Sequence, residues 1–481
     1  MSPSRPPRLP RLAALGLLAL VAACSDPARP DGDGTPPPPP PPPPAVVPDS
    51  LAFPVVPGGR LWLHGDARDS LGTPSDTLVR FTVLDTTVAT VDEKGQVTGR
   101  RPGRTVVVGS AAGRTVRLAV VVRTVRYRDV WPSAGDDGCA LTTDGEALCW
   151  GGNSNGMIGA ETLRSCAWIS PSQGYRCGSW PSDAPTFVRT RARFTTLAVG
   201  WGRRCGLTAD GRVFCWGALA ATTNGIVPCA DTLPRGRCDY APREEPTPLP
   251  WARLAVGAWL VNGTTCALAA GGAPWCWGHD WAGNAGGAGE SSPSPATVPA
   301  PTPVRAAPPL RDLAMGPAVT CGLDADDAVW CWGYRYYFGN DTAGVRGPEA
   351  VREPVRGANG MRFAAISMAN GGCGLTRAGE AWCWWYGTRP APAAPGRTFV
   401  TISAGEVSAC GLTADGEGWC WPYNRAPIPI TQGLRFRTFR VESYTACGIA
   451  LDGRAWCIPY QANGENPPGA VGAPRILAGQ D

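Results

Sequence analysis

Residues 205–217 read CGLTADGRVFCWG, and this stretch decides the fold. Asp210-Gly211 between two apolar runs predicts a β-hairpin whose glycine takes a left-handed conformation. A three-residue loop that ends at Gly211 places Cys205 directly opposite Cys215 on the neighbouring strand. Directly opposed antiparallel residues have Cα atoms about 4.5–5.5 Å apart, which a disulfide can bridge. The stretch therefore predicts a hairpin closed by a cross-strand disulfide.

The same unit recurs seven times, and in every copy the two cysteines lie ten residues apart. An apolar strand precedes the pair, as in the segments that begin at Phe194 and Phe399. Self-similarity of this kind is typical of repeat architectures. We expect each disulfide to contribute about 2–3 kcal/mol to stability. The seven predicted pairs are Cys139 with Cys149, Cys205 with Cys215, Cys266 with Cys276, Cys321 with Cys331, Cys373 with Cys383, Cys410 with Cys420, and Cys447 with Cys457.

The cysteines outside the repeats are two further predicted pairs and Cys24. Of the 19 cysteines, 14 belong to the repeats and one is Cys24. The other four form two predicted pairs, Cys166 with Cys177 and Cys229 with Cys238. Zinc is the alternative ligand for paired cysteines, but zinc sites prefer closely spaced cysteines together with histidine. The chain has two histidines, and an exported protein lies in an oxidising compartment. The sequence therefore predicts disulfides and leaves no thiol for catalysis.

Tryptophan is abundant beside the second cysteine of the repeats. Residues on either side of a strand cysteine face away from it, so we expect these rings to pack one repeat against the next. The eleven that flank this cysteine are Trp150, Trp216, Trp275, Trp277, Trp330, Trp332, Trp382, Trp384, Trp419, Trp421 and Trp456.

The repeat resembles the regulator of chromosome condensation repeat in its bacterial, cysteine-bearing form. The likeness rests on Cys-Ala/Gly-Leu, Asp-Gly and Cys-Trp-Gly, and residues 151–159, GGNSNGMIG, are similar to that family's G-x-N-x-x-G-Q-L-G tail. It covers residues 124–481 and implies a seven-bladed β-propeller. Other residues replace Asp-Gly at 271–272, 326–327 and 378–379, and Trp-Gly at 458–459. The sialidase Asp-box fits less well, because it separates its Asp and Gly by one residue.

The N-terminus is typical of an export signal. Residues 1–23 combine three arginines with a short apolar run that is too short to span a bilayer. The end of this run, LVAAC, resembles the lipobox of bacterial lipoproteins and predicts lipidation of Cys24. The alternative is an ordinary cleaved signal peptide. Residues 24–44 form a linker whose nine prolines predict a stiff spacer of roughly 28 Å.

Residues 45–123 predict a separate unit of short strands. The segments 88–91 and 96–98 flank a turn at Gly95, and two further strands lie within 104–108 and 116–121. The pattern resembles the bacterial Ig-like group 2 domain, although Phe81 stands where that family usually has tryptophan. The predicted fold class is therefore all-β, with an Ig-like β-sandwich followed by a seven-bladed β-propeller.

Catalytic motifs are scarce in this sequence. His64 and His279 lie near no candidate nucleophile, and there is no G-x-S-x-G motif and no P-loop. A carboxylate pair for glycoside hydrolysis stays open among the 39 acidic residues. The net charge of +5 is not gathered in a basic block, so nucleic acid is not indicated. We predict no enzyme activity, no cofactor and no metal ion.

The spacing between repeats points to a binding surface. Successive first cysteines are 66, 61, 55, 52, 37 and 37 residues apart, so repeats 1 to 4 carry long insertions. The insertions follow Cys-Trp-Gly and should project from one face. Aromatic and arginine side chains there suit protein recognition, unless they pack back onto their own loops. The candidate binding residues are Trp168, Tyr175, Trp180, Tyr240, Trp281, Tyr334, Arg335, Tyr336, Tyr337 and Phe338.

Together these patterns predict an exported cell-envelope lipoprotein without enzyme activity, anchored in the outer membrane or at the cell surface by its lipid alone. Its propeller is expected to bind a protein ligand through the long loops of repeats 1 to 4. A glycan-binding module is the alternative, and it would need aromatic platforms beside Asp, Asn or Glu. An adhesive or structural envelope component is a third.

The lipid anchor can be tested directly. Lipidation requires the thiol of Cys24, so Cys24→Ala should move the protein from the membrane fraction to the soluble fraction. Cell fractionation followed by immunoblotting measures the distribution. Unchanged membrane partitioning of the variant would contradict the lipoprotein prediction.

Overall fold

The protein is described by a computed structural model. For the segments 164–170, 174–179, 229–230 and 237–238 only the backbone is described. The described residues are 52–63, 79–93, 95–111, 114–133, 137–153, 156–160, 164–170, 174–179, 182–200, 202–217, 229–230, 237–238, 241–246, 248–259, 262–280, 282–286, 296–340, 349–422, 425–460 and 471–480.

The first two sheets are built from residues before Arg123. One sheet has the order β1-β7-β6-β3 and the other β2-β5-β4, and both contribute to one apolar core around Val97, Val107 and Val120. The hairpins predicted around Gly95 and after Arg104 are present. Assignment of this unit to the bacterial Ig-like family stays a prediction. Its strands are β1 (Phe53–Val55), β2 (Arg60–Trp62), β3 (Arg80–Val83), β4 (Ala89–Val91), β5 (Gln96–Gly99), β6 (Gly103–Ala111) and β7 (Arg114–Val122).

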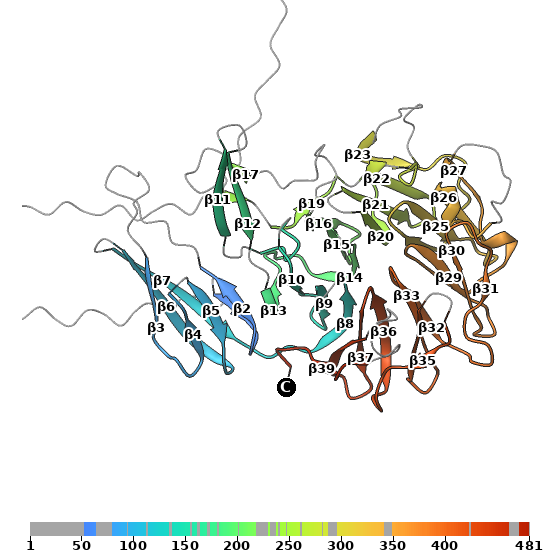
Figure 1. The fold of residues 1–481 in the computed structure, drawn as a ribbon. Coiled ribbons are helices and arrows are strands. Elements are labelled where there is room, and N and C mark those ends of the chain that lie inside the picture. The colour runs from blue at the N-terminus through green and yellow to red at the C-terminus, as the bar shows by residue number, and fades with distance from the viewer. Residues whose placement is uncertain are drawn as a thin grey trace, which may run out of the picture. The chain divides into compact units, whose positions relative to one another are not determined.

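Seven four-stranded antiparallel sheets follow, one for each repeat, and we number them as blades 1 to 7 (Figure 1). Blade 1 contains β8 (Tyr127–Pro132), β9 (Gly138–Thr142), β10 (Ala147–Gly151) and β13 (Ser182–Phe187). Blade 2 contains β14 (Phe194–Val199), β15 (Arg203–Thr208), β16 (Val213–Gly217) and β19 (Arg243–Glu244). Blade 3 contains β20 (Trp251–Trp259), β21 (Asn262–Ala269), β22 (Pro274–Asp280) and β23 (Ala296–Pro303).

The other four blades have the same plan. Blade 4 contains β24 (Asp312–Met315), β25 (Val319–Leu323), β26 (Val329–Tyr334) and β27 (Ala350–Arg356). Blade 5 contains β28 (Ala365–Met368), β29 (Gly371–Leu375), β30 (Ala381–Trp385) and β31 (Ala391–Pro392). Blade 6 contains β32 (Thr401–Ala404), β33 (Ser408–Leu412), β34 (Gly418–Pro422) and β35 (Ile428–Pro429). Blade 7 contains β36 (Phe436–Glu442), β37 (Thr445–Ala450), β38 (Ala455–Pro459) and β39 (Arg475–Ile476).

Helical structure in the described residues is limited to short 3-10 turns, including η2 (Arg335–Tyr337) and η3 (Ala358–Gly360). Within that part of the chain no helix has the length and apolar character to cross a membrane. The fold is all-β, and the predicted β-propeller is confirmed.

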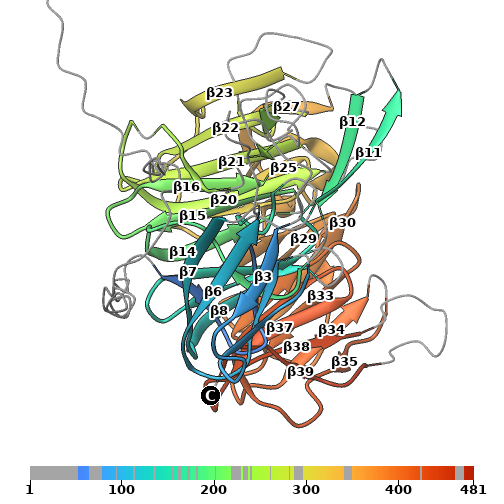
Figure 2. The same ribbon diagram turned by 90° about the vertical axis from the view of Figure 1, so that its left-hand side faces the viewer.

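The blades form a closed ring. The first strand of each blade contacts the first strand of the next, and β36 of the last blade contacts β8 of the first. β37 also lies beside β8 in both views of the ribbon (Figures 1 and 2). Every blade consists of four strands in sequence order, so among the described strands none from one end of the chain completes a blade at the other. Side chains and short backbone contacts must therefore close the ring.

Arg440 is the main side chain at this closure. Its guanidinium pairs with Asp129, donates to the backbone oxygen of Val130 at 3.3 Å, and stacks 4.7 Å from the ring centre of Trp131. The Tyr127 hydroxyl also donates to the backbone oxygen of Ala478 at 2.8 Å. These contacts join blade 7 to blade 1 across more than 300 residues of sequence.

The hairpin in each repeat has the predicted register. Cys205 pairs with Cys215, and Leu207 pairs with Val213. Gly211 lies at φ 79°, and its amide donates to Thr208 at 3.1 Å. The replacement residue Asp327 also takes the left-handed conformation, at φ 64°. The three-residue turn therefore tolerates the departures from Asp-Gly because Gly, and less readily Asp, can adopt this backbone geometry.

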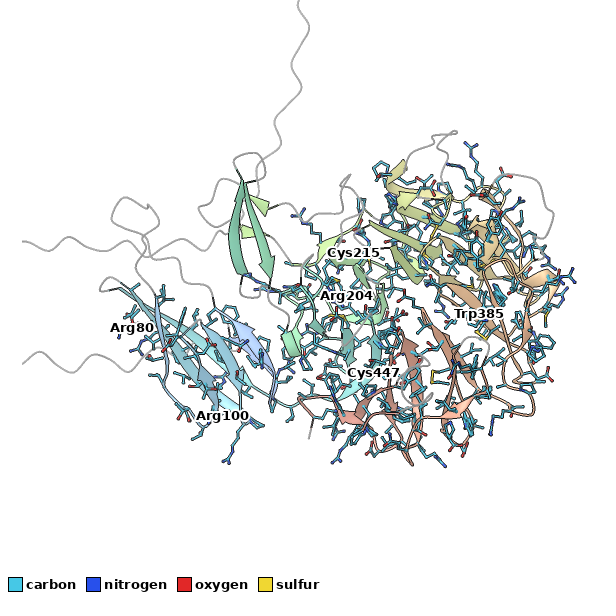
Figure 3. All side chains as sticks on the ribbon, in the orientation of Figure 1. Arg80, Arg100, Arg204, Cys215, Trp385 and Cys447 are labelled. Carbon is cyan, nitrogen blue, oxygen red and sulfur yellow. A yellow bond between two sulfur atoms is a disulfide. The ribbon has the colours of Figure 1, made fainter. Side chains whose placement is uncertain are left out.

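All seven repeat pairs are disulfide-bonded, with Cα atoms 4.0–4.1 Å apart (Figure 3). This separation is slightly shorter than the 4.5–5.5 Å expected for opposed strand residues. The seven bonds join Cys139 to Cys149, Cys205 to Cys215, Cys266 to Cys276, Cys321 to Cys331, Cys373 to Cys383, Cys410 to Cys420, and Cys447 to Cys457.

The cysteines outside the repeats are described only in part. In the hairpin of β11 (Arg164–Ser170) with β12 (Gly174–Ser179), the backbone sets Cys166 opposite Cys177. In the hairpin of β17 (Cys229–Ala230) with β18 (Arg237–Cys238), Cys229 stands opposite Cys238. The side chains of these four cysteines lie outside the described part of the structure, and so does the whole of Cys24. The two insertion disulfides and the lipidation of Cys24 therefore stay predictions.

The tryptophan after the second cysteine packs against the disulfide of the preceding blade. Trp332 of blade 4 is fully buried in one cluster with Cys266 and Cys276 of blade 3. Its indole nitrogen donates to the backbone oxygen of Asn284, also in blade 3, at 3.0 Å. Trp216, Trp277, Trp384 and Trp421 make the corresponding contacts around the ring. Ile458 takes this place in blade 7, where the repeat lacks tryptophan.

The small residue after the first cysteine is explained by the same interface. A Cβ atom added to Gly206 would come within 2.4 Å of the Phe194 ring, which covers this position. Phe363 covers Gly374 in the same way. The Cys-Ala/Gly-Leu pattern therefore provides space for an aromatic ring from the first strand of the blade.

The contribution of the interblade tryptophans can be measured on Trp332. Trp332→Ala should lower the free energy of unfolding by about 3–5 kcal/mol, because it removes a buried ring and leaves a cavity against the disulfide. Trp332→Phe should cost less, since it keeps most of the apolar contact and loses the bond to Asn284. Denaturant unfolding followed by tryptophan fluorescence measures both. Equal stability of Trp332→Ala and the parent protein would contradict this role.

Candidate functional site

The long insertions all connect the third and fourth strands of a blade. They lie between β10 and β13, β16 and β19, β22 and β23, and β26 and β27. Because strands alternate in direction, these connections leave the same face of the propeller, which we call the insertion face. Blade 7 also has a long connection here, from Tyr460 to Pro474, although no comparable loop was predicted for repeats 5 to 7. The cysteine spacing could not reveal it, because no cysteine follows Cys457.

Half of the predicted binding residues cannot be placed in detail. Trp180, Tyr240 and Trp281 lie outside the described residues. Trp168 and Tyr175 face each other in the register of the β11–β12 hairpin, but their side chains are outside the described part. Their role in binding stays a prediction.

The run Tyr334–Phe338 is described completely and divides into two parts. Tyr334 ends β26, and residues 335–337 form the turn η2. Phe338 is 2% exposed and packs in the core between blades 4 and 5 beside Trp384. It is therefore a core residue and is not available to a ligand, in contrast to its place among the predicted binding residues. The other four side chains of the run are half-buried.

Tyr334, Tyr336 and Tyr337 form an aromatic cluster with Tyr386 of blade 5. Tyr336 and Tyr386 stack with ring centres 4.8 Å apart, and the hydroxyls of Tyr334 and Tyr386 lie 3.3 Å apart. Tyr386 is 53% exposed. The backbone oxygen of Tyr336 also accepts a bond from Gly387 at 2.7 Å, which fixes the two loops together. Sequence analysis missed Tyr386 because the short fifth repeat gave no sign that it reaches the loop of the fourth.

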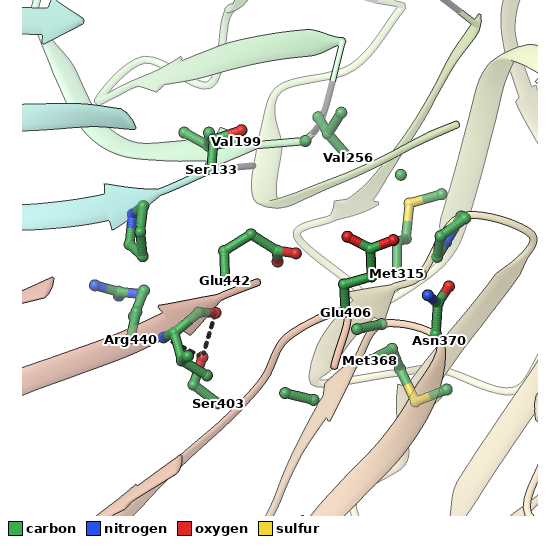
Figure 4. A pocket seen from close by; sticks show the side chains of 18 of the residues that line it. Ser133, Val199, Val256, Met315, Met368, Asn370, Ser403, Glu406, Arg440 and Glu442 are labelled. Atoms are coloured by element: carbon green, nitrogen blue, oxygen red, sulfur yellow. Dashed lines mark hydrogen bonds between the residues drawn. The ribbon is translucent and has the colours of Figure 1, made fainter. Parts of the chain in front are cut away.

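A cavity of about 550 Å³ lies in the central channel of the propeller (Figure 4). Every blade contributes residues from the end of its first strand, among them Val199, Val256, Met315 and Met368. Tyr337 and Tyr386 also line it. First strands and third strands run in the same direction, so the cavity lies toward the insertion face and beside the tyrosine cluster.

Two glutamates of neighbouring blades point into this cavity. Glu406 follows β32 in blade 6, and Glu442 ends β36 in blade 7 (Figure 4). The Ser443 hydroxyl donates to Glu406 at 3.0 Å. Burial, with the adjacent charge of Glu406, raises the pKa of Glu442 to about 7. This carboxyl therefore exchanges its proton near neutral pH, unlike an ordinary glutamate.

The arginine nearest to this pair is already engaged. Arg440 lines the same cavity, but its guanidinium is turned to Asp129 and the Trp131 ring at the ring closure. No described cation is among the groups that shift the pKa of Glu442. Among the described residues, the centre of the channel consequently holds two carboxyl groups beside one arginine whose guanidinium is paired elsewhere.

Acidic, polar and apolar side chains share the lining of this cavity. The described residues contain no group of three or more His, Cys, Asp or Glu side chains placed to hold one. The wall around the two carboxyl groups combines apolar side chains such as Val256 and Met368 with polar ones such as Ser133 and Asn370. Ligand sites in proteins commonly combine apolar walls with a few polar groups in this way.

Comparison with known proteins shows the fold. No family model matches the chain, and no curated protein matches it. Among solved structures, human WBSCR16 is 14% identical with a TM-score of 0.51, over 76% of this chain and 98% of that chain. Yeast RCC1 (Prp20) in complex with Kap60 is 18% identical with a TM-score of 0.50, over 65% and 78%.

A second structure of Prp20p, from Saccharomyces cerevisiae, is 17% identical with a TM-score of 0.50, over 70% of this chain and 87% of that chain. Its description concerns binding of Prp20p to Gsp1p and histones. At this level of identity the likeness establishes an RCC1-like β-propeller as the fold of residues that follow the first two sheets.

The raised pKa of Glu442 predicts how stability depends on pH. The folded protein holds the proton to about pH 7, whereas the unfolded chain releases it near the ordinary value of 4.5, so this group makes stability fall as pH rises between these values. Glu442→Gln removes the effect. It should therefore raise the melting temperature at pH 8 by about 2 °C and give no gain at pH 4.

Thermal unfolding at both pH values measures this difference. The matched control is Glu380→Gln, which changes an exposed glutamate in the turn of blade 5. Its melting temperature should follow the parent protein at both pH values. A Glu442→Gln variant that is less stable than the parent at pH 8 would mean that the ionised carboxylate is structurally required.

Proposed function

We propose that this chain is a non-enzymatic binding protein whose propeller recognises a protein partner with the insertion face of blades 4 and 5. The observation that carries the proposal is the tyrosine cluster, Tyr334, Tyr336, Tyr337 and Tyr386. Its rings are held by mutual stacking and by contacts between two loops, and Tyr386 is 53% exposed. Tyrosine is among the residues that most often dominate binding energy at protein interfaces.

The rigidity of the cluster supports binding at low entropic cost. A ring that is already packed against its neighbours loses little side-chain freedom when a partner covers it. Arg335 lies in the same turn and adds a second residue type that is enriched at interfaces. The alternative, that the loop rings serve only local packing, applies to Phe338 and in part to Tyr337, which also borders the core between blades 4 and 5.

The structural neighbours support the same class of function. Prp20 is described in complex with Kap60, and its binding to Gsp1p and histones is described as well. An exported protein would meet other partners, so we transfer only the use of the propeller as a protein-binding platform. We further propose that Cys24 carries a lipid and that residues 24–44 hold the propeller away from the membrane, as the sequence predicts.

Glycoside hydrolysis is the second candidate, favoured by one observation. Glu406 and Glu442 form a carboxyl pair in a cavity, and the pKa of Glu442 is raised as in a general acid. Against this, the Ser443 hydroxyl of blade 7 donates to Glu406 of blade 6, so the pair takes part in the contact between these two blades. Release of nitrophenol from a panel of nitrophenyl glycosides, lost in Glu406→Gln and Glu442→Gln, would establish this function in place of pure binding.

The binding proposal is tested by affinity capture from envelope and culture-supernatant proteins, run beside a glycan array. A specific protein partner is expected. Tyr336→Ala combined with Tyr386→Ala should weaken its binding by about 2 kcal/mol or more, because the two stacked rings lose their contact area. Surface plasmon resonance measures the change.

The control is Leu451→Ala, which removes an apolar side chain that is 64% exposed on a turn of blade 7. It should bind the partner as the parent protein does. Circular dichroism should show all variants folded, because neither tyrosine is buried. Unchanged affinity of the double variant would exclude the cluster as the contact surface, and binding to glycans alone would favour the glycan-binding alternative.

A further inference from the structure

The central cavity combines features that the tyrosine cluster does not use. Glu406 and Glu442 converge in it from blades 6 and 7, and its wall is formed by apolar side chains such as Val256, Met315 and Met368 (Figure 4). Its volume of about 550 Å³ is in the range of small-ligand sites in proteins.

The ionised form of Glu442 is unfavourable in this place. Glu406 is exposed to solvent, but burial of Glu442 and the adjacent charge of Glu406 together raise the pKa of Glu442. The nearest arginine, Arg440, is bound to Asp129 and to the backbone of Val130. The site is therefore electrostatically matched to one positive charge that is not among the described residues.

The shape of the site selects the kind of cation. The carboxyl groups and the Ser443 hydroxyl are hydrogen-bonding groups at one wall, while the other walls carry Val256, Met315 and Met368 together with the polar Asn370. Tyr337 and Tyr386 stand at the insertion face of the cavity, where their rings can contact an alkyl chain or a cation as it enters. A flexible alkyl chain that ends in a compact, strongly hydrogen-bonding charge fits this combination.

We propose that the central channel is a binding site for a primary alkylammonium group, with Glu406 and Glu442 as its acceptors. The ammonium lies between the two carboxylates, and the alkyl chain runs along the apolar wall toward Tyr337 and Tyr386. The group belongs either to a free aliphatic amine or to a lysine side chain of the protein partner. The site goes beyond the proposed protein contact, because it requires the channel glutamates and not the exposed cluster.

The first test is calorimetric titration of the purified protein with 1,5-diaminopentane. Saturable binding at one site is expected, and Glu406→Gln and Glu442→Gln should each weaken it about tenfold or more by removing one charged acceptor. The uncharged analogue 1-pentanol should not bind. Glu380→Gln, an exposed glutamate outside the cavity, is the matched control and should leave the affinity unchanged.

Binding should also release a proton, which a purely structural pair of glutamates would not do. The ammonium favours the ionised form of Glu442, so affinity should rise as pH increases from about 6 to about 8. Titrations in buffers of different ionisation enthalpy measure the release. The charged and titratable groups around Glu442 are Glu406, Arg440 with its partner Asp129, Tyr444 and Tyr460.

Among these groups, Glu442 is the one expected to titrate in that range, since its pKa is about 7 and burial raises the pKa of the Tyr460 hydroxyl above its usual value. Loss of the pH dependence in Glu442→Gln is therefore expected. Absence of diaminopentane binding at millimolar concentration, or equal binding to the parent and both glutamine variants, would overturn the proposal.

The second arm separates the two sources of the ammonium group. If the ammonium group is a partner's lysine, Nα-acetyl-lysine methylamide should compete with the captured partner for binding, and Glu442→Gln should lower the affinity for that partner. If it is a free amine, the partner should bind Glu442→Gln normally while diaminopentane does not. Partner binding that needs Tyr336 and Tyr386, with no amine binding, would refute the channel site and leave the proposed function intact. Amine binding without any protein partner would support the channel site and contradict the proposed protein-binding function.

Discussion

The contact between a tryptophan of one blade and the disulfide of the preceding blade is the interaction on which the rest of the structure depends. The disulfide faces one neighbour and the tryptophan that follows it faces the other, because adjacent residues of a strand point to opposite sides. Trp332 on Cys266 and Cys276 is one instance, and its indole also bonds to the backbone of that earlier blade. Repetition of one short motif therefore builds both the interior of each blade and the interface between blades.

This frame explains why the connections can vary without loss of the fold. The blades are joined through their strands, their disulfides and the first residues of the third-to-fourth strand connections. In three of these connections the backbone oxygen of Met157, Asn284 or Tyr337 accepts a bond from the tryptophan of the next blade, and in the loop after β26 Phe338 also enters the core. The same loop is thus fixed at its base and exposes Tyr336 beside Tyr386, which gives a rigid surface for recognition.

The central channel contains charged side chains, in contrast to the apolar contacts between blades. Arg440 is used to close the ring between blades 7 and 1, where no exchanged strand does so. The neighbouring Glu406 and Glu442 are left facing a cavity, and the pKa of Glu442 is raised to about 7 in consequence. Glu406 also accepts a hydrogen bond from Ser443 of blade 7, so the same pair contributes to the contact between blades 6 and 7.

The local rules were readable from the sequence, because they act over a few residues. The ten-residue cysteine spacing and the turn at Gly211 determine the hairpin register, and the residue order around Cys215 determines which side chains face each neighbour. The predicted all-β propeller followed from seven repeats of that pattern. Tertiary structure alone decided that Phe338 is core and that Tyr386 of another blade completes the tyrosine cluster. Tertiary structure also brought Glu406, Glu442 and Arg440 to one cavity, because closure of the ring places the ends of seven first strands around a common axis. The repeat pattern of the sequence does not indicate which side chains meet at that axis.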